Sequence, residues 1–298
     1  MIQRIGIVAK AQLHAAAPHL CQIAAWLDAR GIEPVFDPDS AALAAAAGTA
    51  GTTGTCRAIE KEDLPRHVDM VLVLGGDGTL LAMADCIGHA GTDIPILGVN
   101  FGSLGFLTEV TLPELYTSLE AALAGTARID ERLMLRSVTT RGDRAVAERL
   151  VLNDVVVTQG TLSRIINLSV SVGHEFMMHL KADGLIVSSP TGSTAYNLAA
   201  GGPIVHPGVD ALTITPIAPH TLTNRPVVVP ASSEIRIQPL INEGNDRVFA
   251  AFDGQFSVQL QAGDVVLVRR AERPLRLIRA SARHYFDVLR EKLKWGER

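Results

Sequence analysis

Residues 71–81, Val-Leu-Val-Leu-Gly-Gly-Asp-Gly-Thr-Leu-Leu, place four apolar residues directly before a glycine-rich turn. A short apolar run that ends in glycines predicts a strand buried on both faces. The glycines permit a tight turn and let the backbone approach a ligand closely. The apolar segment that follows, through about Ala90, predicts a helix, whose first N–H groups lack partners inside the helix and favour anions. A buried strand, a glycine turn and an anion-binding helix start are therefore expected here.

Asp77 is the single charge in this turn, and two interpretations of it stay open. The carboxylate could take a proton from a hydroxyl that attacks phosphorus, or it could only cap the helix that follows. The turn is not a Walker A loop, and Leu81 stands where a dinucleotide fingerprint needs a small residue. We therefore expect backbone amides near Gly75, Gly76 and Thr79 to hold phosphates without a P-loop lysine.

The composition predicts a globular protein of about two domains. The chain has 298 residues, of which 47% are hydrophobic and 19% charged, so a sizeable core can form. A net charge of −4 and 4% aromatic residues do not favour a nucleic-acid binder. The sequence contains neither a signal-peptide pattern nor an apolar run long enough to cross a bilayer. Three scattered cysteines, Cys21, Cys56 and Cys86, are typical of reduced thiols in a cytoplasmic protein.

The first part of the chain, residues 1–125, alternates predicted strands with predicted helices. Strands are expected at 2–9, 32–36 and 94–100, and helices at 16–30, 41–47 and 112–123. This alternation predicts a parallel, doubly wound sheet, in which ligands bind beyond the carboxyl ends of the strands. The Gly/Thr-rich segment 48–55 is expected to be a mobile loop.

After about residue 126 the pattern becomes β-rich. Strand-like runs lie at 133–140, 145–158, 165–172, 185–188, 212–217, 235–237, 248–252 and 265–269, with one short helix at about 193–200. This pattern predicts a second, mostly antiparallel domain of sandwich type over 126–275. Residues 282–294 are again helical, and the segment 276–298 is expected to pack back on the first domain.

Three polar stretches of the second part are candidate binding segments. Asn153-Asp154 interrupts an apolar run and suits ribose hydroxyls, although a bulge or turn with side-chain bonding explains the pair as well. Residues 183–203 place small hydroxyl residues and glycines around Tyr196, where a flat ring could fit; Ser193 and Thr194 could cap the short helix or meet phosphate. Phe252-Asp253-Gly254-Gln255 on its own indicates a hairpin turn.

Isolated charged residues and histidines indicate a binding site less strongly than these polar stretches do. Arg164 and Lys181 lie near the candidate segments in sequence and could meet phosphate, although single charges are more often solvated. The nine histidines show no metal-ligand spacing.

These stretches together, with the loop Asn100-Phe101-Gly102-Ser103-Leu104-Gly105-Phe106-Leu107, resemble the NAD kinase family over nearly the whole chain. The turn Gly75–Gly78 alone also resembles 6-phosphofructokinases and diacylglycerol and sphingosine kinases, whereas the run 183–203 is specific to the family. The resemblance implies an N-terminal Rossmann-like α/β domain and a C-terminal antiparallel β-sandwich, assembled as homodimers or homotetramers. It also implies that the γ-phosphate of ATP is transferred to the 2′-hydroxyl on the adenosine ribose of NAD.

The resemblance also assigns residue roles. Asp77 would be the general base, and Mg²⁺ would arrive on the nucleotide rather than in a protein cage. The NAD-binding positions that it implies are Asp77, Gly78, Asn153, Asp154, Arg164, Lys181, Asp183, Thr194, Ala195, Tyr196, Asn197, Leu198, Ala199, Ala218 and Gln255.

Other functions stay open on the sequence. A lipid or sugar kinase could share only the glycine turn, but Gly192–Tyr196 argues against it. A non-catalytic NAD(P)-sensing module would have no use for Asp77 as a base. Inorganic polyphosphate instead of ATP, NADH instead of NAD, and feedback by NADP(H) are not distinguished by the sequence.

Overall fold

The computed structural model describes residues 2–295 except 47–56, 103, 161–164, 242–246 and 281–282. The expected mobile loop at 48–55, Cys56 and Arg164 therefore lie outside the described residues. The chain divides into two compact units, Met1–Glu131 with Leu275–Arg298, and Arg132–Pro274. Within the described ranges, no helix combines the length and apolar character needed to cross a membrane.

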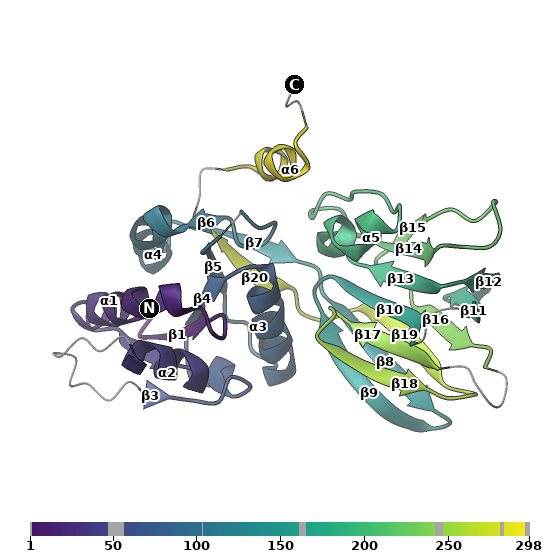
Figure 1. The fold of residues 1–298 in the computed structure, drawn as a ribbon, viewed down its shortest axis with the longest axis horizontal. Helices are drawn as coiled ribbons and strands as arrows, with labels where there is room; N and C mark the ends of the chain where they lie inside the picture. Colours follow the sequence, from purple (N-terminus) through teal and green to yellow (C-terminus); the bar gives the residue numbers. More distant parts are fainter. Residues whose placement is uncertain are drawn as a thin grey trace. The chain divides into compact units, whose positions relative to one another are not determined.

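The first unit contains a sheet with strand order β3-β2-β1-β4-β5-β20-β7, and β6 also pairs with β5 (Figure 1). The strands are β1 (Arg4–Ala9), β2 (Glu33–Phe36), β3 (Arg57–Ala58), β4 (Met70–Gly75), β5 (Ile96–Asn100), β6 (Val110–Thr111), β7 (Arg128–Arg132) and β20 (Leu275–Arg279). β1 pairs in parallel with β2 and β4, and β5 pairs in parallel with β4, β6 and β20. The predicted parallel, doubly wound sheet is confirmed, whereas β20 was not predicted.

Helices cover both faces of this sheet. The helices of the first unit are η1 (His14–Ala16), α1 (Ala17–Asp28), α2 (Pro38–Ala46), η2 (Leu64–Arg66), α3 (Asp77–Ala90), η3 (Leu112–Glu114), α4 (Leu115–Leu123) and α6 (Tyr285–Leu293). Alternate strand residues such as Ile5, Ile7 and Leu72 share one core cluster with α1, α2 and α4. Gly6, whose position alternates with Ile5 and Ile7, faces Leu64 of η2 instead, and α3 packs against η2 and β4. A strand presents successive side chains to opposite faces, so α3 covers the face opposite α1.

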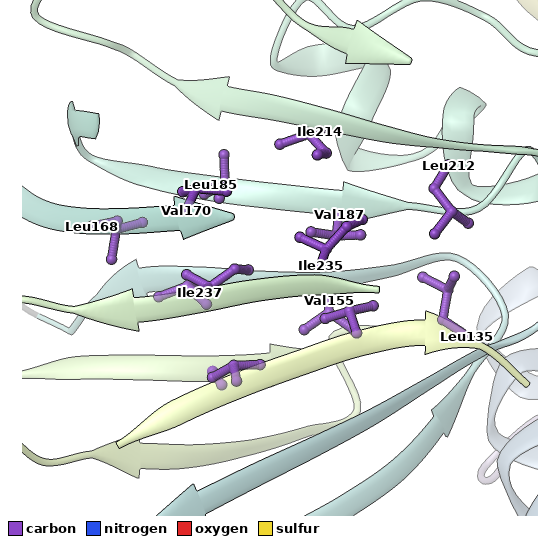
Figure 2. Close-up of a cluster of buried hydrophobic side chains, with 14 of the residues drawn as sticks. Leu135, Val155, Leu168, Val170, Leu185, Val187, Leu212, Ile214, Ile235 and Ile237 are labelled. Carbon is purple, nitrogen blue, oxygen red and sulfur yellow. The ribbon is translucent and has the colours of Figure 1, made fainter. Parts of the chain in front are cut away.

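The second unit consists of two antiparallel sheets that enclose one core. The orders are β15-β14-β13-β10-β17-β18 and β12-β11-β16-β19-β8-β9. Figure 2 shows residues of both sheets meeting in this core, among them Leu185 and Val187 of one sheet and Leu168 and Ile235 of the other. The elements are β8 (Leu135–Arg141), β9 (Arg144–Val151), β10 (Asp154–Gln159), β11 (Ile166–Val172), β12 (Glu175–Ala182), β13 (Gly184–Ser188), η4 (Thr191–Thr194), α5 (Tyr196–Ala199), β14 (Ala211–Ile217), β15 (Val227–Pro230), β16 (Ile235–Pro239), β17 (Val248–Phe252), β18 (Phe256–Leu260) and β19 (Val265–Arg270). The predicted antiparallel β domain is confirmed.

Two local predictions are corrected. The run 145–158 is not one strand, because it divides at Leu152-Asn153 into β9 and β10, which belong to different sheets. The helix expected at 193–200 is also interrupted, because Ala195 takes a non-helical conformation (φ −93°, ψ −130°) between η4 and α5. Both breaks fall in segments that the sequence analysis selected for their polar residues.

Candidate functional site

A cavity of about 370 Å³ lies in the first unit, beyond the carboxyl ends of β1, β4 and β5. It is lined by Lys10, Leu13, Gly75, Gly76, Asp77, Asn100, Phe101, Gly102, Gly105 and Lys292. In the order β3-β2-β1-β4-β5, the direction of strand succession reverses between β1 and β4. The cavity therefore occupies the place where doubly wound sheets bind ligands.

The glycine turn joins β4 to α3 at the edge of this cavity. Gly76 is the N-cap residue of α3 and provides no side-chain hydrogen bond to the helix. The N–H of Thr79 donates to the carbonyl oxygen of Gly76 at 3.0 Å, whereas no described residue accepts from the N–H groups of Asp77 and Gly78 at the start of this 14-residue helix. Gly78 is exposed, and Thr79 lies so close to Gly75 that a Cβ built there would be 2.7 Å from Thr79 Oγ1.

The Asp77 carboxylate is held by the loop that follows β5. Its Oδ2 accepts a hydrogen bond from the N–H of Phe106 at 2.9 Å, and its Oδ1 accepts from the N–H groups of Leu107 and Thr108 at 3.1 and 3.0 Å. The Thr108 hydroxyl also donates to Oδ1 at 2.9 Å. Asp77 is the first residue of α3 and does not cap its own helix, so the interpretation of this carboxylate as a cap is wrong.

Gly105 allows this close approach of loop and turn. A Cβ built at Gly105 would lie 2.1 Å from Asp77 Oδ1 and 2.4 Å from Thr108 Oγ1. Asn100 Nδ2 donates to Thr108 Oγ1 at 3.1 Å, and Asn100 Oδ1 accepts from the N–H of Gly102 at 2.6 Å. Asn100, at the end of β5, and Thr108 thus fix the position of the Asp77 carboxylate.

In the second unit, the Asp253 carboxylate fixes the backbone at Asn153 and Asp154. Its carboxylate accepts hydrogen bonds from the N–H groups of Leu152, Asn153 and Asp154 at 2.7, 2.8 and 3.0 Å. Asp253 and Gly254 have positive φ values of 48° and 65°, which are typical of the tight hairpin turn predicted at 252–255. This turn fixes the backbone where the chain passes from β9 to β10.

Asn153 and Asp154 occupy different environments. The carbonyl oxygen of Asn153 accepts from the N–H of Ser189 at 2.9 Å and would lie 2.2 Å from a Cβ at Gly192. Asp154 is buried, and no described residue donates a hydrogen bond to its carboxylate. Burial, and secondarily the neighbouring Asp253 carboxylate, raise the pKa of Asp154 to about 7. Asp154 is therefore a buried acceptor to which none of the described residues donates.

The segment after β13 is rigid because its polar groups bond one another. The Ser193 hydroxyl donates to the carbonyl oxygen of Pro190 at 2.6 Å and accepts from the N–H of Val205 at 2.9 Å. Asn197 Nδ2 donates to the carbonyl oxygens of Ser193 and Pro203, and Asn197 Oδ1 accepts from the hydroxyls of Thr213 and Thr215. Ser193 is fully buried and caps no helix, so its predicted capping role is corrected.

The predicted NAD-binding residues of the second unit gather at two opposite ends of one sheet. Asn153, Asp154 and Gln255 lie at the end where β10 begins and β17 ends, and the 194–199 segment follows β13 at that end. Lys181, Asp183 and Ala218 lie at the other end, where β13 begins and β14 ends. Since β13 has five residues, about 16 Å separates the two groups.

Exposure differs among these residues. Tyr196 is 46% exposed; Ala199, Gln255 and Lys181 are exposed, whereas Thr194, Ala195, Leu198 and Asp183 are partly buried. Ala218 is exposed and has a positive φ of 44°, which is uncommon for a residue with a Cβ.

Four residues of these sites escaped the sequence analysis. Lys10 directly follows a predicted strand, so its place at a carboxyl end was available from the pattern. Asp253 was assigned only to a turn, and its three amide partners lie about a hundred residues earlier. Thr108 and Lys292 carried no local signal, because their role depends on contacts with residues distant in sequence.

Comparison with known proteins identifies relatives over the full chain. The family models of the ATP-NAD kinase N-terminal and C-terminal domains match residues 5–127 and 152–280. An NAD kinase of Geobacter metallireducens is 48% identical over 297 residues, and one of Geobacter sulfurreducens is 46% identical over 297; each alignment covers both chains completely.

Solved structures agree in fold. Yeast NADH kinase complexed with NADH superposes with a TM-score of 0.89 at 26% identity, over 100% of this chain and 89% of that one. An NAD kinase from Archaeoglobus fulgidus in complex with ATP has a TM-score of 0.74 at 23% identity, over 97% of this chain and 99% of that one.

Proposed function

This chain belongs to the ATP-NAD kinase family, whose reaction converts NAD to NADP, and we propose how its own residues carry out that reaction. The phosphoryl donor is ATP, which the Archaeoglobus fulgidus relative binds, and the acceptor is the 2′-hydroxyl on the adenosine ribose of NAD. The observation that carries the proposal is the Asp77 carboxylate, fixed by three backbone amides at the edge of a cavity.

Asp77 is the general base in this proposal. Oδ1 already accepts three hydrogen bonds, whereas Oδ2 accepts one, from the N–H of Phe106. Each carboxylate oxygen offers about two lone-pair sites, so Oδ2 is the oxygen with room for a further proton. It takes the proton of the 2′-hydroxyl as that oxygen bonds to the γ-phosphorus and the bond to the ADP oxygen breaks.

The donor phosphates contact the cavity of the first unit. The backbone of Gly75 and Gly76 lines the cavity, and Thr79 lies beside Gly75 in the first turn of α3. Among the residues that the structure describes, no cluster of His, Cys, Asp or Glu side chains is arranged to hold a metal ion. We propose that Mg²⁺ enters with the nucleotide, where it neutralises phosphate charge, and that Asp77 and Asn100 are the cavity side chains with oxygen atoms that could face it.

The NAD-binding residues of this proposal are named from the family resemblance. They are Asp77 and Gly78 in the first unit and Asn153, Asp154, Lys181, Asp183, Thr194, Ala195, Tyr196, Asn197, Leu198, Ala199, Ala218 and Gln255 in the second, with Arg164 outside the described residues. Asp154 suits a ribose hydroxyl because its carboxylate is buried and receives no hydrogen bond from the described part of the chain. The Asn197 side chain is fully occupied, so it acts by shaping the segment around it. We also propose a cytoplasmic homodimer or homotetramer.

The test is NADP formation by the purified chain with NAD, Mg²⁺ and either ATP or inorganic polyphosphate. We expect a product that carries the new phosphate on the 2′-oxygen, formed with ATP. If product forms only with polyphosphate, the phosphoryl donor is polyphosphate and not ATP. A chain that binds NAD and makes no NADP with either donor would be a sensing module, and turnover of a lipid or sugar in preference to NAD would assign another kinase activity.

A further inference from the structure

The cavity of the first unit carries two lysines that the sequence motifs do not include. Lys10 directly follows β1, and its N–H donates to the carbonyl oxygen of Leu74 at 2.8 Å. Lys292 comes from α6, close to the end of the described chain, and its Nζ lies 5.7 Å from the centre of the Phe106 ring. Neither ammonium group forms an ion pair with a described residue. Both line the same cavity as the glycine turn.

The lining of this cavity has the chemistry of a polyphosphate site. Four of its ten residues are glycines, which leave backbone accessible, and its charged side chains are two lysines and Asp77. Asp77 is already engaged by the loop after β5, so the two lysines are the cavity charges that form no ion pair within the described ranges. Lysine is a common phosphate-binding residue in proteins because its ammonium group acts as a point charge.

Ion pairs hold the strand and the residue that precede α6 in the first unit. Arg279 of β20 contacts Glu109 at 2.6 Å, and both side chains are largely buried. Arg283, two residues before α6 begins, contacts Glu114 at 3.0 Å. Glu109 directly follows Thr108, whose N–H and hydroxyl bond Asp77. One segment, residues 105–114, therefore connects the Asp77 carboxylate to the strand and linker that precede Lys292.

We propose that Lys292 of the C-terminal helix binds the polyphosphate chain of the phosphoryl donor, together with Lys10 from the opposite end of the sequence. The proposal rests on the proposed function for the identity of the reaction, and it adds the residues that replace a P-loop lysine. Two lysines 282 positions apart supply what a Walker A motif supplies within one loop. The shared ligand chemistry is a chain of linked phosphates, found in ATP and in inorganic polyphosphate.

The experiment measures binding of inorganic tripolyphosphate and of magnesium ATP to the full chain by calorimetry at constant ionic strength, without NAD. The variants are Lys292→Gln and Lys292→Arg, with Lys294→Gln as a matched control that removes the same charge from an exposed position outside the cavity. We expect Lys292→Gln to weaken tripolyphosphate binding roughly tenfold and Lys294→Gln by less than about twofold. Lys292→Arg should recover part of the affinity.

Steady-state kinetics separate donor from acceptor binding. Lys292→Gln should raise the KM for ATP about tenfold and leave the KM for NAD unchanged. Equal affinities in Lys292→Gln and Lys294→Gln, or no tripolyphosphate binding by the parent chain, would overturn the proposal. A loss for tripolyphosphate but not for ATP would support the site with inorganic polyphosphate as its occupant.

Lys10→Gln provides a second variant of the same cavity, and we expect the same direction of change from it. If Lys10→Gln binds tripolyphosphate and ATP as tightly as the parent does, Lys10 and Lys292 do not form one phosphate site. If the parent makes no NADP yet binds tripolyphosphate through Lys292, the proposed function fails and the phosphate site stands. If NADP is made and Lys292→Gln changes neither the affinity for tripolyphosphate nor the KM for ATP, the proposed function stands and the phosphate site fails.

Discussion

Two carboxylates in this molecule, Asp77 and Asp253, each accept hydrogen bonds from three successive backbone N–H groups. The two arrangements differ in which partner is positioned for function. At Asp77 the amides of residues 106–108 hold the carboxylate itself, which lines a cavity. At Asp253 the carboxylate holds the amides of residues 152–154, and the residues that it fixes are the candidate ligands. The same bonding pattern can thus position a reactive group in one unit and a binding segment in the other.

The comparison predicts its largest effect for Asp77→Asn. The amide is nearly isosteric but cannot accept the ribose proton, and it also accepts fewer of the N–H bonds from residues 106–108, so kcat should fall roughly 10²- to 10⁴-fold. Steady-state NADP formation measures it. An unchanged kcat would show that the held carboxylate is not the base and that both carboxylates serve only to shape the backbone.

Gly105→Ala should have the next largest effect, because the new Cβ would lie 2.1 Å from Asp77 Oδ1. Either the loop or the carboxylate must move, and we expect kcat to fall roughly 10- to 100-fold. The control is the same substitution in the Asp77→Asn background, where it should change kcat less than about threefold. Full additivity of the two effects would mean that Gly105 acts independently of Asp77.

Asp253→Asn tests the second unit. Asn tolerates the positive φ of the turn but accepts fewer N–H bonds, so the Asn153-Asp154 segment loses part of its support. We expect NAD affinity to fall roughly tenfold and the free energy of unfolding to fall by about 2 kcal/mol. Calorimetry and urea denaturation measure these changes.

Asp143→Asn is the matched control for Asp253→Asn. Asp143 lies in the exposed turn between β8 and β9, and no described residue bonds its carboxylate. The Asp143→Asn substitution should leave both the NAD affinity and the free energy of unfolding unchanged. If Asp253→Asn behaves like this control, the three amide bonds are dispensable.

The smallest effect concerns the pH dependence of stability. The pKa of Asp154 rises to about 7 in the folded chain, so folding favours its protonated form. Its contribution to stability is therefore greatest below about pH 4, falls as the pH rises toward 7, and is constant above that. Relative to Asp154→Asn, the parent should lose on the order of 1–2 kcal/mol between pH 6 and pH 8.

Urea unfolding of both proteins at these two pH values measures this difference. Titrating groups that do not interact with Asp154 contribute equally to the parent and to Asp154→Asn and cancel in the comparison. Parallel pH dependence of the two proteins would show that Asp154 is well hydrated or bonded in the folded state.

The sequence was sufficient for features that depend on neighbours in the chain. The run of four apolar residues before Gly75 predicted β4, and the segment through Ala90 predicted α3 to its last residue. The Asp-Gly pair at 253–254 predicted the hairpin between β17 and β18. In each case hydrophobic pattern or turn chemistry acts over a few residues, and tertiary contacts reinforce the same outcome.

Features that depend on distant residues were not available from the sequence. The strand-like run 145–158 divides because Asp253 fixes the backbone at 152–154. The polar pair Asn153-Asp154 marks that point as a possible bulge or turn, but it does not indicate that the two strands belong to different sheets. β12 was missed because Phe176, Met177 and Met178 interrupt the alternation expected of a strand. Lys10 and Lys292 meet only in the folded first unit, so no motif spacing links them.

The most direct test of the account is to measure, in the same samples, the dissociation constant for NAD and the single-turnover rate of phosphoryl transfer at saturating NAD. Asp77→Asn and Asp253→Asn are compared with the parent chain. We expect Asp77→Asn to keep NAD affinity within about threefold and lose at least about 100-fold in rate. Asp253→Asn should show a weaker affinity and a nearly unchanged rate. If both variants lose affinity and rate in the same proportion, the assignment of chemistry to Asp77 and of ligand positioning to Asp253 is contradicted.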